Sequence, residues 1–150
     1  MSAMSGSASI EIEAPIDAVW AIVQDVESAP HWQQGIDSMD ALERDGEGRA
    51  ICAETTTDAK VKVFKARLSF EYEPPVLVSW VQQRGDLKSM AGSWQLEDLG
   101  GGRTGAAYTL RADPGALLAQ FLKGALEQKM RAILIDGRPA ELKARAEGSA

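Results

Sequence analysis

Near its N-terminus the chain reads Glu13-Ala14-Pro15-Ile16-Asp17-Ala18-Val19-Trp20-Ala21-Ile22-Val23-Gln24-Asp25, and Pro30-His31-Trp32 follows shortly after. Pro15 suits the first position of a helix, because the N–H that it lacks would have no partner there and its φ is already helical. Beyond it, apolar residues recur at helical spacing on one face: Ile16, Val19, Trp20 and Val23. The pattern predicts a helix from Pro15 to about Asp25 and a second short helix or turn over residues 26–33.

From there to residue 113 the chain alternates strand patterns with turn signals. Ile10 and Ile12 alternate with glutamates, which predicts a short first strand, and further strands are predicted over residues 36–44, 49–57, 61–73, 76–83, 87–97 and 103–112. The links between them are short, and several contain glycine, which indicates an antiparallel meander. Residues 1–8 are small and polar and are expected to be disordered. A single folded domain is therefore predicted over residues 9–147.

The last element is predicted to be a long helix. Asp113 would cap it, and Pro114 would take its first position. At about 100° per residue its apolar face comprises Leu118, Phe121, Leu122, Ala125, Leu126 and Ile133. Pro139 is expected to break or kink this helix after Gly137, because proline inside a helix costs about 3 kcal/mol. Residues 140–147 can then resume as a short terminal helix.

Composition narrows the classes of function. The 150 residues carry a net charge of −6, which argues against nucleic acid and against electrostatic attachment to an anionic membrane. Cys52 is the one cysteine and His31 the one histidine, so no internal disulfide can form and a zinc site is not expected. Neither a membrane-spanning apolar run nor a secretory signal is recognised, and a cytoplasmic location is the expectation. No cofactor is predicted.

Four groups of residues carry a family resemblance. The first comprises Ala14, Pro15, Val19, Trp20, Asp25, Pro30 and Trp32; the others are Glu71-Tyr72-Glu73-Pro74-Pro75, Gly92-Ser93-Trp94-Gln95-Leu96 and Gly101-Gly102-Arg103-Thr104. In this order they resemble the START-like superfamily, which includes polyketide cyclase/dehydrase-type proteins, ubiquinone-binding carriers and lipid-transfer domains. The resemblance implies an α+β helix-grip fold. In that fold a curved antiparallel sheet wraps around a long C-terminal helix, and two short helices follow the first strand.

The resemblance also implies a ligand pocket between sheet and long helix, entered near Trp32. A filled core is the alternative, although the inner face mixes bulky aromatic residues with small ones such as Ala66 and Gly92 that need not close tightly. Pockets of this kind are largely apolar, with a few polar groups that set orientation. The expected ligand contacts are Trp32, Phe64, Leu68, Phe70, Trp80, Met90, Trp94, Tyr108, Leu118, Phe121, Leu122, Ala125 and Lys129.

The candidates for proton chemistry are Lys129, Tyr108, Glu54 and His31. Lys129 falls within the apolar face of the predicted helix. Either its stem lies on the core with the ammonium group in water, or the ammonium group enters the cavity and pairs with a ligand or with Glu54. Histidine is the usual side chain for proton transfer at neutral pH, and His31 is expected in the entrance loop, either solvated or acting on a ligand. No nucleophilic triad is recognised.

These patterns favour a small-molecule binding protein, a carrier or sequestering protein for an apolar, lipid-, isoprenoid- or polyketide-like ligand. An aromatase/cyclase-type enzyme is the first alternative, because positioning alone can lower the barrier of a cyclisation. A module that binds a protein partner is the second alternative. It would require a filled core and an apolar outer face, and the charges of Lys65, Arg67 and Glu71 on that face argue against it.

Overall fold

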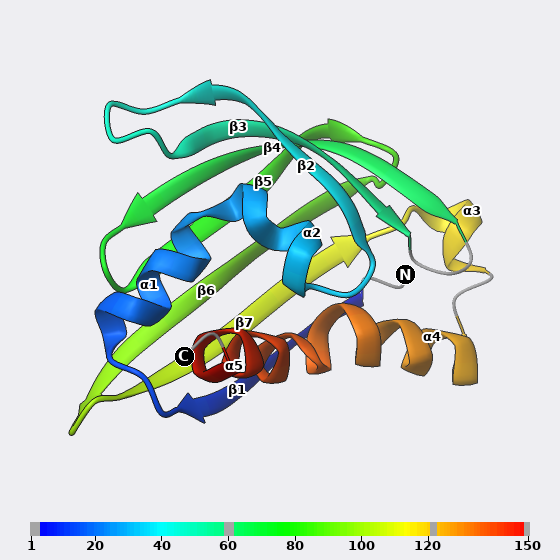
Figure 1. Cartoon of the computed structure of the whole chain (residues 1–150). Helices are drawn as coiled ribbons and strands as arrows, with labels where there is room; N and C mark the ends of the chain where they lie inside the picture. The colour runs from blue at the N-terminus through cyan, green and yellow to red at the C-terminus, as the bar shows by residue number, and fades with distance from the viewer. Residues whose placement is uncertain (1–3, 59–61, 121–122, 149–150) are drawn as a thin grey trace.

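A curved antiparallel sheet forms one layer of the molecule, and helices cover its inner face (Figure 1). The computed structural model describes residues 4–58, 62–120 and 123–148. Within these residues the strand order is β1-β7-β6-β5-β4-β3-β2. The strands are β1 (Met4–Ile12), β2 (Ile36–Arg44), β3 (Ala50–Asp58), β4 (Val63–Glu73), β5 (Leu77–Gly85), β6 (Ser89–Gly100) and β7 (Arg103–Asp113). From β2 to β7 each strand pairs with the next, which confirms the predicted meander.

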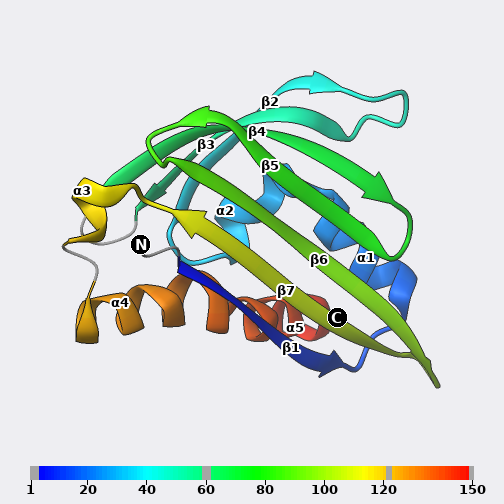
Figure 2. The same ribbon diagram turned by 180° about the vertical axis from the view of Figure 1, so that it is seen from behind.

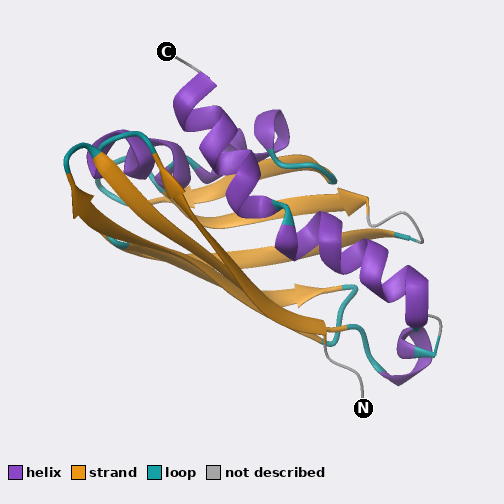
Figure 3. Ribbon diagram, turned by 90° about the horizontal axis from the view of Figure 1, so that it is seen from below, coloured by secondary structure: helices purple, strands orange, loops and turns teal. Residues whose placement is uncertain are grey.

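Two groups of helices flank the sheet. After β1 come α1 (Ile16–Gln24), the single turn η1 (Val26–Ser28) and α2 (Ala29–Trp32). After β7 come α3 (Ala116–Ala119), α4 (Gly124–Arg131), the π-helical turn η2 (Ala132–Asp136) and α5 (Arg138–Gly148). Together α4, η2 and α5 form one long helix that crosses the inner face of the sheet (Figure 3). This is the helix-grip fold that the sequence predicts.

The opening helix forms where the sequence predicts it, but Pro15 is its N-cap, with φ −68° and ψ 155°, and not its first helical residue. Its N-terminal carbonyl, that of Pro15, accepts hydrogen bonds from the N–H groups of Ala18 and Val19 at 3.0 and 3.2 Å. Val19, Trp20 and Val23 are buried against the sheet. The apolar face that the spacing predicts is therefore the face that packs on the core.

The N-terminus corrects one prediction. Residues 1–8 are expected to be disordered, but β1 begins at Met4, and residues 1–3 lie outside the described part of the chain. Met4 is paired with Ala112 of β7, and the register continues to Ile12 opposite Thr104. The Met4 side chain is buried, 6 % exposed. Pairing with β7 satisfies the backbone groups of residues 4–8, a long-range effect that their small, polar side chains do not reveal.

The start of the long helix is a second correction. Asp113 belongs to β7, and its carboxylate accepts a hydrogen bond from the Gly115 N–H at 2.9 Å, which caps a turn and not a long helix. Gly115 has a φ of 89°, in the left-handed region, which excludes it from a regular helix. The long helix starts at Gly124, as the back view also shows (Figure 2).

The predicted irregularity near Pro139 takes the form of a π-helical turn. The Gly137 N–H donates to the Ala132 carbonyl oxygen at 2.9 Å, a bond across five residues. Pro139 then lies in the first turn of α5, where its missing N–H costs little. The helix therefore continues past Pro139, and the wide turn changes which residues face the sheet.

Candidate functional site

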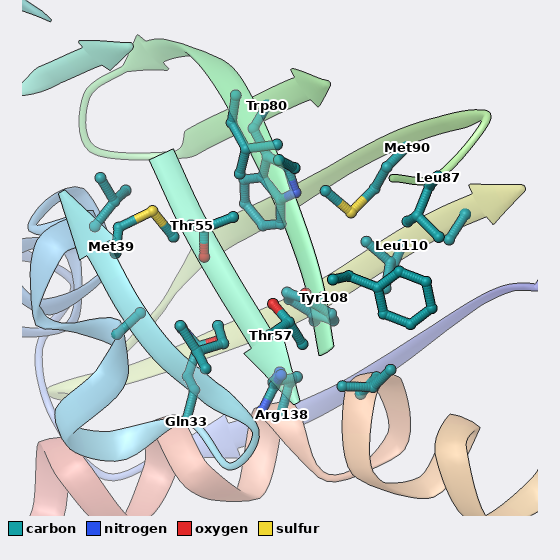
Figure 4. Close-up of a pocket in the computed structure, with 18 of the residues that line it drawn as sticks. Gln33, Met39, Thr55, Thr57, Trp80, Leu87, Met90, Tyr108, Leu110 and Arg138 are labelled. Carbon is teal, nitrogen blue, oxygen red and sulfur yellow. The ribbon is translucent and has the colours of Figure 1, made fainter. Parts of the chain in front are cut away.

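A pocket with a volume of about 130 Å³ lies between the inner face of the sheet, the α1–α2 segment and the long helix (Figure 4). Its sheet wall comes from β1 to β7, and its helix wall from Met130, Leu134 and Arg138. An engineered apolar cavity of about 150 Å³ holds a benzene-sized molecule. The enclosed space therefore matches a ring-sized or short-chain apolar group.

The sheet wall of the pocket agrees with the strand alternation. Eight of the residues predicted as ligand contacts line it or its rim: Trp32, Phe64, Leu68, Phe70, Trp80, Met90, Trp94 and Tyr108. Four rings form a contact chain, with centroid separations of 6.1 Å for Phe70–Trp80, 5.8 Å for Trp80–Tyr108 and 4.7 Å for Trp94–Tyr108. Such tilted aromatic contacts hold the rings in defined orientations.

Gly92 positions the Trp80 indole. Trp80 of β5 lies directly opposite Gly92 of β6 in the sheet. A Cβ atom added to Gly92 would come within 2.6 Å of the Trp80 ring, so the indole lies over a position without a side chain. The sequence suggests that Gly92 leaves space in the core, whereas in the structure Trp80 uses that space.

Trp32 closes the pocket near α2. Its ring centroid lies 6.2 Å from that of Trp94, and its Nε1–H donates to the Ser28 hydroxyl at 3.0 Å. The neighbouring His31 is exposed, and the pocket lining does not include it. The histidine therefore lies on the solvent side of the short helix that presents Trp32.

Arg138, which the sequence analysis does not identify, is the charged residue in the helix wall. It begins α5 and is 2 % exposed. Its Nη1 donates to the Gln34 carbonyl oxygen at 2.7 Å and to Glu141 Oε1 at 3.0 Å. Its Nε is buried with no partner among the described residues. Glu141 also accepts a bond from the Gln34 N–H at 2.8 Å, so both partners hold the α2–β2 loop against the helix.

Tyr108 faces Arg138 across the pocket wall (Figure 4). Burial raises the pKa of the Tyr108 hydroxyl, and the guanidinium of Arg138 beside it opposes that rise. Tyr108 is 5 % exposed. The hydroxyl therefore remains protonated at neutral pH and is available as a hydrogen-bond donor.

Further pocket residues come from strands that the prediction located but did not assign. They include Met39 of β2, Thr55 and Thr57 of β3, Leu87, and Leu110 of β7. The Thr55 hydroxyl donates to the Ser38 carbonyl oxygen at 2.9 Å, which satisfies it within the wall. The odd-numbered positions of β3 alternate inward, so the same period that identified β4 could have identified Thr55 and Thr57.

The helix wall differs from the prediction. Lys129 and Ala125 are exposed and lie outside the pocket. The residues that face inward are spaced by four: Met130, Leu134, Arg138 and Leu142. A regular helix beginning at Pro114 would place Ala125 and Lys129 on the apolar face, whereas the helix that begins at Gly124 turns Met130 inward. The π-helical turn after Arg131 then changes the spacing of the inward residues that follow it. Phe121, Leu122 and the side chain of Leu118 lie outside the described part of the structure.

Glu54 also differs from the prediction. It lies on the outer face of the sheet, exposed, with its carboxylate 2.9 Å from Arg67 Nη2. It therefore cannot pair with a cation inside the pocket. Within the described ranges, no cluster of potential metal ligands is found, and no helix combines the length and apolar character that crossing a membrane requires.

Comparison with known proteins assigns the family. Residues 4–147 match the family model described as polyketide cyclase/dehydrase and lipid transport. The chain belongs to this family. A search of curated proteins returns no match.

Solved structures of low identity share the fold of this chain. A START superfamily protein from Mycobacterium smegmatis is 18 % identical with a TM-score of 0.82, over 97 % of this chain and 99 % of that one. A protein from Thermus thermophilus is 18 % identical with a TM-score of 0.81, over 98 % and 99 %. The Zhui aromatase/cyclase from Streptomyces sp. R1128 is 16 % identical with a TM-score of 0.76, over 97 % and 94 %.

Proposed function

We propose that this protein binds a small, mainly apolar molecule between the sheet and the long helix, as a carrier or sequestering protein. The observation that supports this is the pocket itself, an aromatic and aliphatic wall interrupted by a few polar groups. Sites for apolar ligands combine such a wall with a small number of polar groups that fix orientation. The family also includes lipid transport proteins by its description.

An aromatase/cyclase-type enzyme is the second candidate, and the pair Tyr108 and Arg138 favours it, because both groups can donate hydrogen bonds to a reacting oxygen. A cyclisation also needs a group that removes a proton. Burial raises the pKa of Tyr108, so its hydroxyl is a donor and a poor base at neutral pH. His31, which could act as a base, is exposed outside the pocket. The geometry therefore favours binding over turnover.

Two measurements test the carrier proposal. Native mass spectrometry of freshly purified protein, compared with a denatured extract, detects a molecule that co-purifies. Titration with 1-aminoanthracene, a neutral dye whose fluorescence rises in apolar surroundings, detects an accessible pocket. We expect saturable binding of one dye per chain.

A pair of variants on β7 locates the binding. Ala112 lines the pocket, whereas Ala107, on the same strand, faces the opposite side of the sheet. Ala112→Phe should fill part of the pocket and weaken dye binding at least about tenfold, and Ala107→Phe should leave it within about twofold. If the wild-type protein carries no ligand and shows no saturable dye binding, the proposal is wrong. Equal loss in both variants would place the dye outside the pocket.

A further inference from the structure

The side chain of Arg138 has hydrogen-bonding capacity that the protein does not use. A guanidinium group has five N–H donors in a planar fork. Nη1 is engaged by the Gln34 carbonyl oxygen and by Glu141. The Nε–H, by contrast, has no partner among the described residues, although it is fully buried. An unpaired buried donor is costly, and one at a pocket wall is a candidate for contact with a ligand.

The unused donor lies on a particular edge of the guanidinium. The Nε–H and one N–H of Nη2 are parallel and point to the same side, away from the outer edge of Nη1 that Glu141 and Gln34 occupy. This edge matches two coplanar acceptor oxygens, the geometry of a carboxylate. A hydroxyl or a single carbonyl oxygen would fill only half of it.

The surroundings of this edge suit an acid group on an apolar molecule. The Tyr108 hydroxyl oxygen accepts a hydrogen bond from the guanidinium, and its O–H can still donate to a bound oxygen. Glu141 is the carboxylate paired with Arg138, and its side chain is 21 % exposed, so it lies toward the outer end of the pair. The rest of the lining is largely aromatic and aliphatic and contacts the apolar part of a ligand. In Figure 4 the Arg138 side chain extends from the helix toward Tyr108, and Met90 and Trp80 lie farther from the helix, beyond Tyr108.

We propose that the free edge of Arg138, together with the Tyr108 hydroxyl, binds the carboxylate of an amphipathic ligand whose apolar part occupies the pocket. This inference rests on the proposed binding function and specifies the chemical class of the ligand. Arg138 sets the orientation: the acid group meets the long helix, and the apolar part extends toward Trp80 and Met90.

The test compares an acid with its matched alcohol. 4-Phenylbutyrate and 4-phenylbutan-1-ol have the same apolar part, and each is used at neutral pH to displace 1-aminoanthracene from the protein. In the wild type we expect the carboxylate to bind at least about tenfold more tightly than the alcohol, as charge-assisted, bidentate hydrogen bonds require. Tyr108→Phe should weaken the binding of 4-phenylbutyrate a few-fold and leave the binding of 4-phenylbutan-1-ol almost unchanged.

Variants at Arg138 test whether this residue causes the preference for the carboxylate over the alcohol. Arg138→Lys keeps a positive charge but lacks the planar edge, and it should lose most of the preference for the carboxylate. Arg138→Met should abolish that preference, and Arg67→Met, on the outer face, should retain it. Dye binding by each variant reports whether its pocket is intact, and the wild-type comparison stands even if Arg138→Met does not fold.

Each outcome has a separate meaning. Equal affinity of the wild type for acid and alcohol overturns the carboxylate site and leaves the carrier proposal standing. A preference that persists in Arg138→Lys and Arg138→Met also overturns it, because another cation would then bind the acid. Failure of 1-aminoanthracene to bind saturably is a failure of the carrier proposal itself.

Discussion

The two sides of the sheet each carry an arginine–glutamate pair of nearly the same length. On the outer face the Arg67–Glu54 distance is 2.9 Å, with the side chains 32 % and 53 % exposed. On the helix-facing side the Arg138–Glu141 distance is 3.0 Å, with the side chains 2 % and 21 % exposed. Both arginines have a buried Nε without a partner in the described residues. The chemistry is the same, and the surroundings differ.

The difference decides what each pair contributes. Water and salt screen the outer pair, and exposed pairs of this kind contribute about 0–1 kcal/mol. The guanidinium of the inner pair is buried, so water cannot readily take the place of Glu141 or the Gln34 carbonyl oxygen as its partner. The inner arginine also lines the pocket, where its spare donor would meet the proposed ligand, whereas Arg67 lies on the other side of the sheet.

Replacing each arginine tests this comparison most directly and has the largest expected effect. Arg138→Met should lower the free energy of unfolding by about 1.5–3 kcal/mol, because it removes the hydrogen bonds of a buried guanidinium to Glu141 and to the Gln34 carbonyl oxygen. Arg67→Met should lower it by about 1 kcal/mol or less. Urea unfolding followed by far-UV circular dichroism measures both. Equal losses in the two variants would show that burial does not separate the pairs.

Two glycines sharpen the same comparison at a smaller scale. Gly92 faces the helix, and a Cβ atom there would lie 2.6 Å from the Trp80 ring; Gly105, on the outer face, has its nearest neighbour at 3.7 Å. Gly92→Ala should therefore destabilise the protein by about 1–3 kcal/mol, because Trp80 must move. Gly105→Ala should stabilise it by up to about 1 kcal/mol, since alanine is favoured over glycine in a strand. Thermal unfolding of both variants checks the opposite signs.

The sheet could be predicted from the sequence because its signals are local. Alternation from Phe64 to Phe70 assigns the inner face of β4, and the aromatic residues Trp80 and Trp94 follow the same period on β5 and β6. The strand at residues 4–8 was missed for the opposite reason. Its small side chains carry no pattern, and pairing with β7 alone defines it.

The helix wall could not be predicted because its phase depends on two backbone events. Gly115, with a positive φ, prevents a regular helix directly after β7, so the long helix starts only at Gly124. The π-helical turn at 132–136 then changes the spacing of the residues that face the sheet beyond it. A signal did exist: Met130, Leu134, Arg138 and Leu142 recur every four residues, and Arg138 is the charged one of the four. The cation of the helix wall is therefore Arg138, the one charged residue in this apolar series, and not Lys129 as the helical wheel predicts.

The two tyrosines provide the last test, which begins with a pH titration of the unsubstituted protein. Tyr108 faces the pocket, whereas Tyr72 lies near the rim, where its hydroxyl donates to the Ala50 carbonyl oxygen at 2.5 Å. Burial raises the pKa of both hydroxyls above the ordinary value near 10. We therefore expect no tyrosinate absorbance near pH 10 while the chain is folded, and a normal titration in guanidinium chloride.

The sign of the effect on stability follows from linkage. Because the folded pKa of each hydroxyl lies above the unfolded value, the unfolded chain releases its protons first as the pH rises past about 10. The free energy of unfolding should be independent of these groups below that pH and should fall above it, so that ionisation and unfolding occur together. If one tyrosine ionised near pH 10 in the folded protein, its hydroxyl would be in contact with water. Tyr72→Phe would then show which tyrosine ionises. If the absorbance change near pH 10 disappears in this variant, it belongs to Tyr72; if it remains, it belongs to Tyr108, and water lies beside Tyr108 and Arg138.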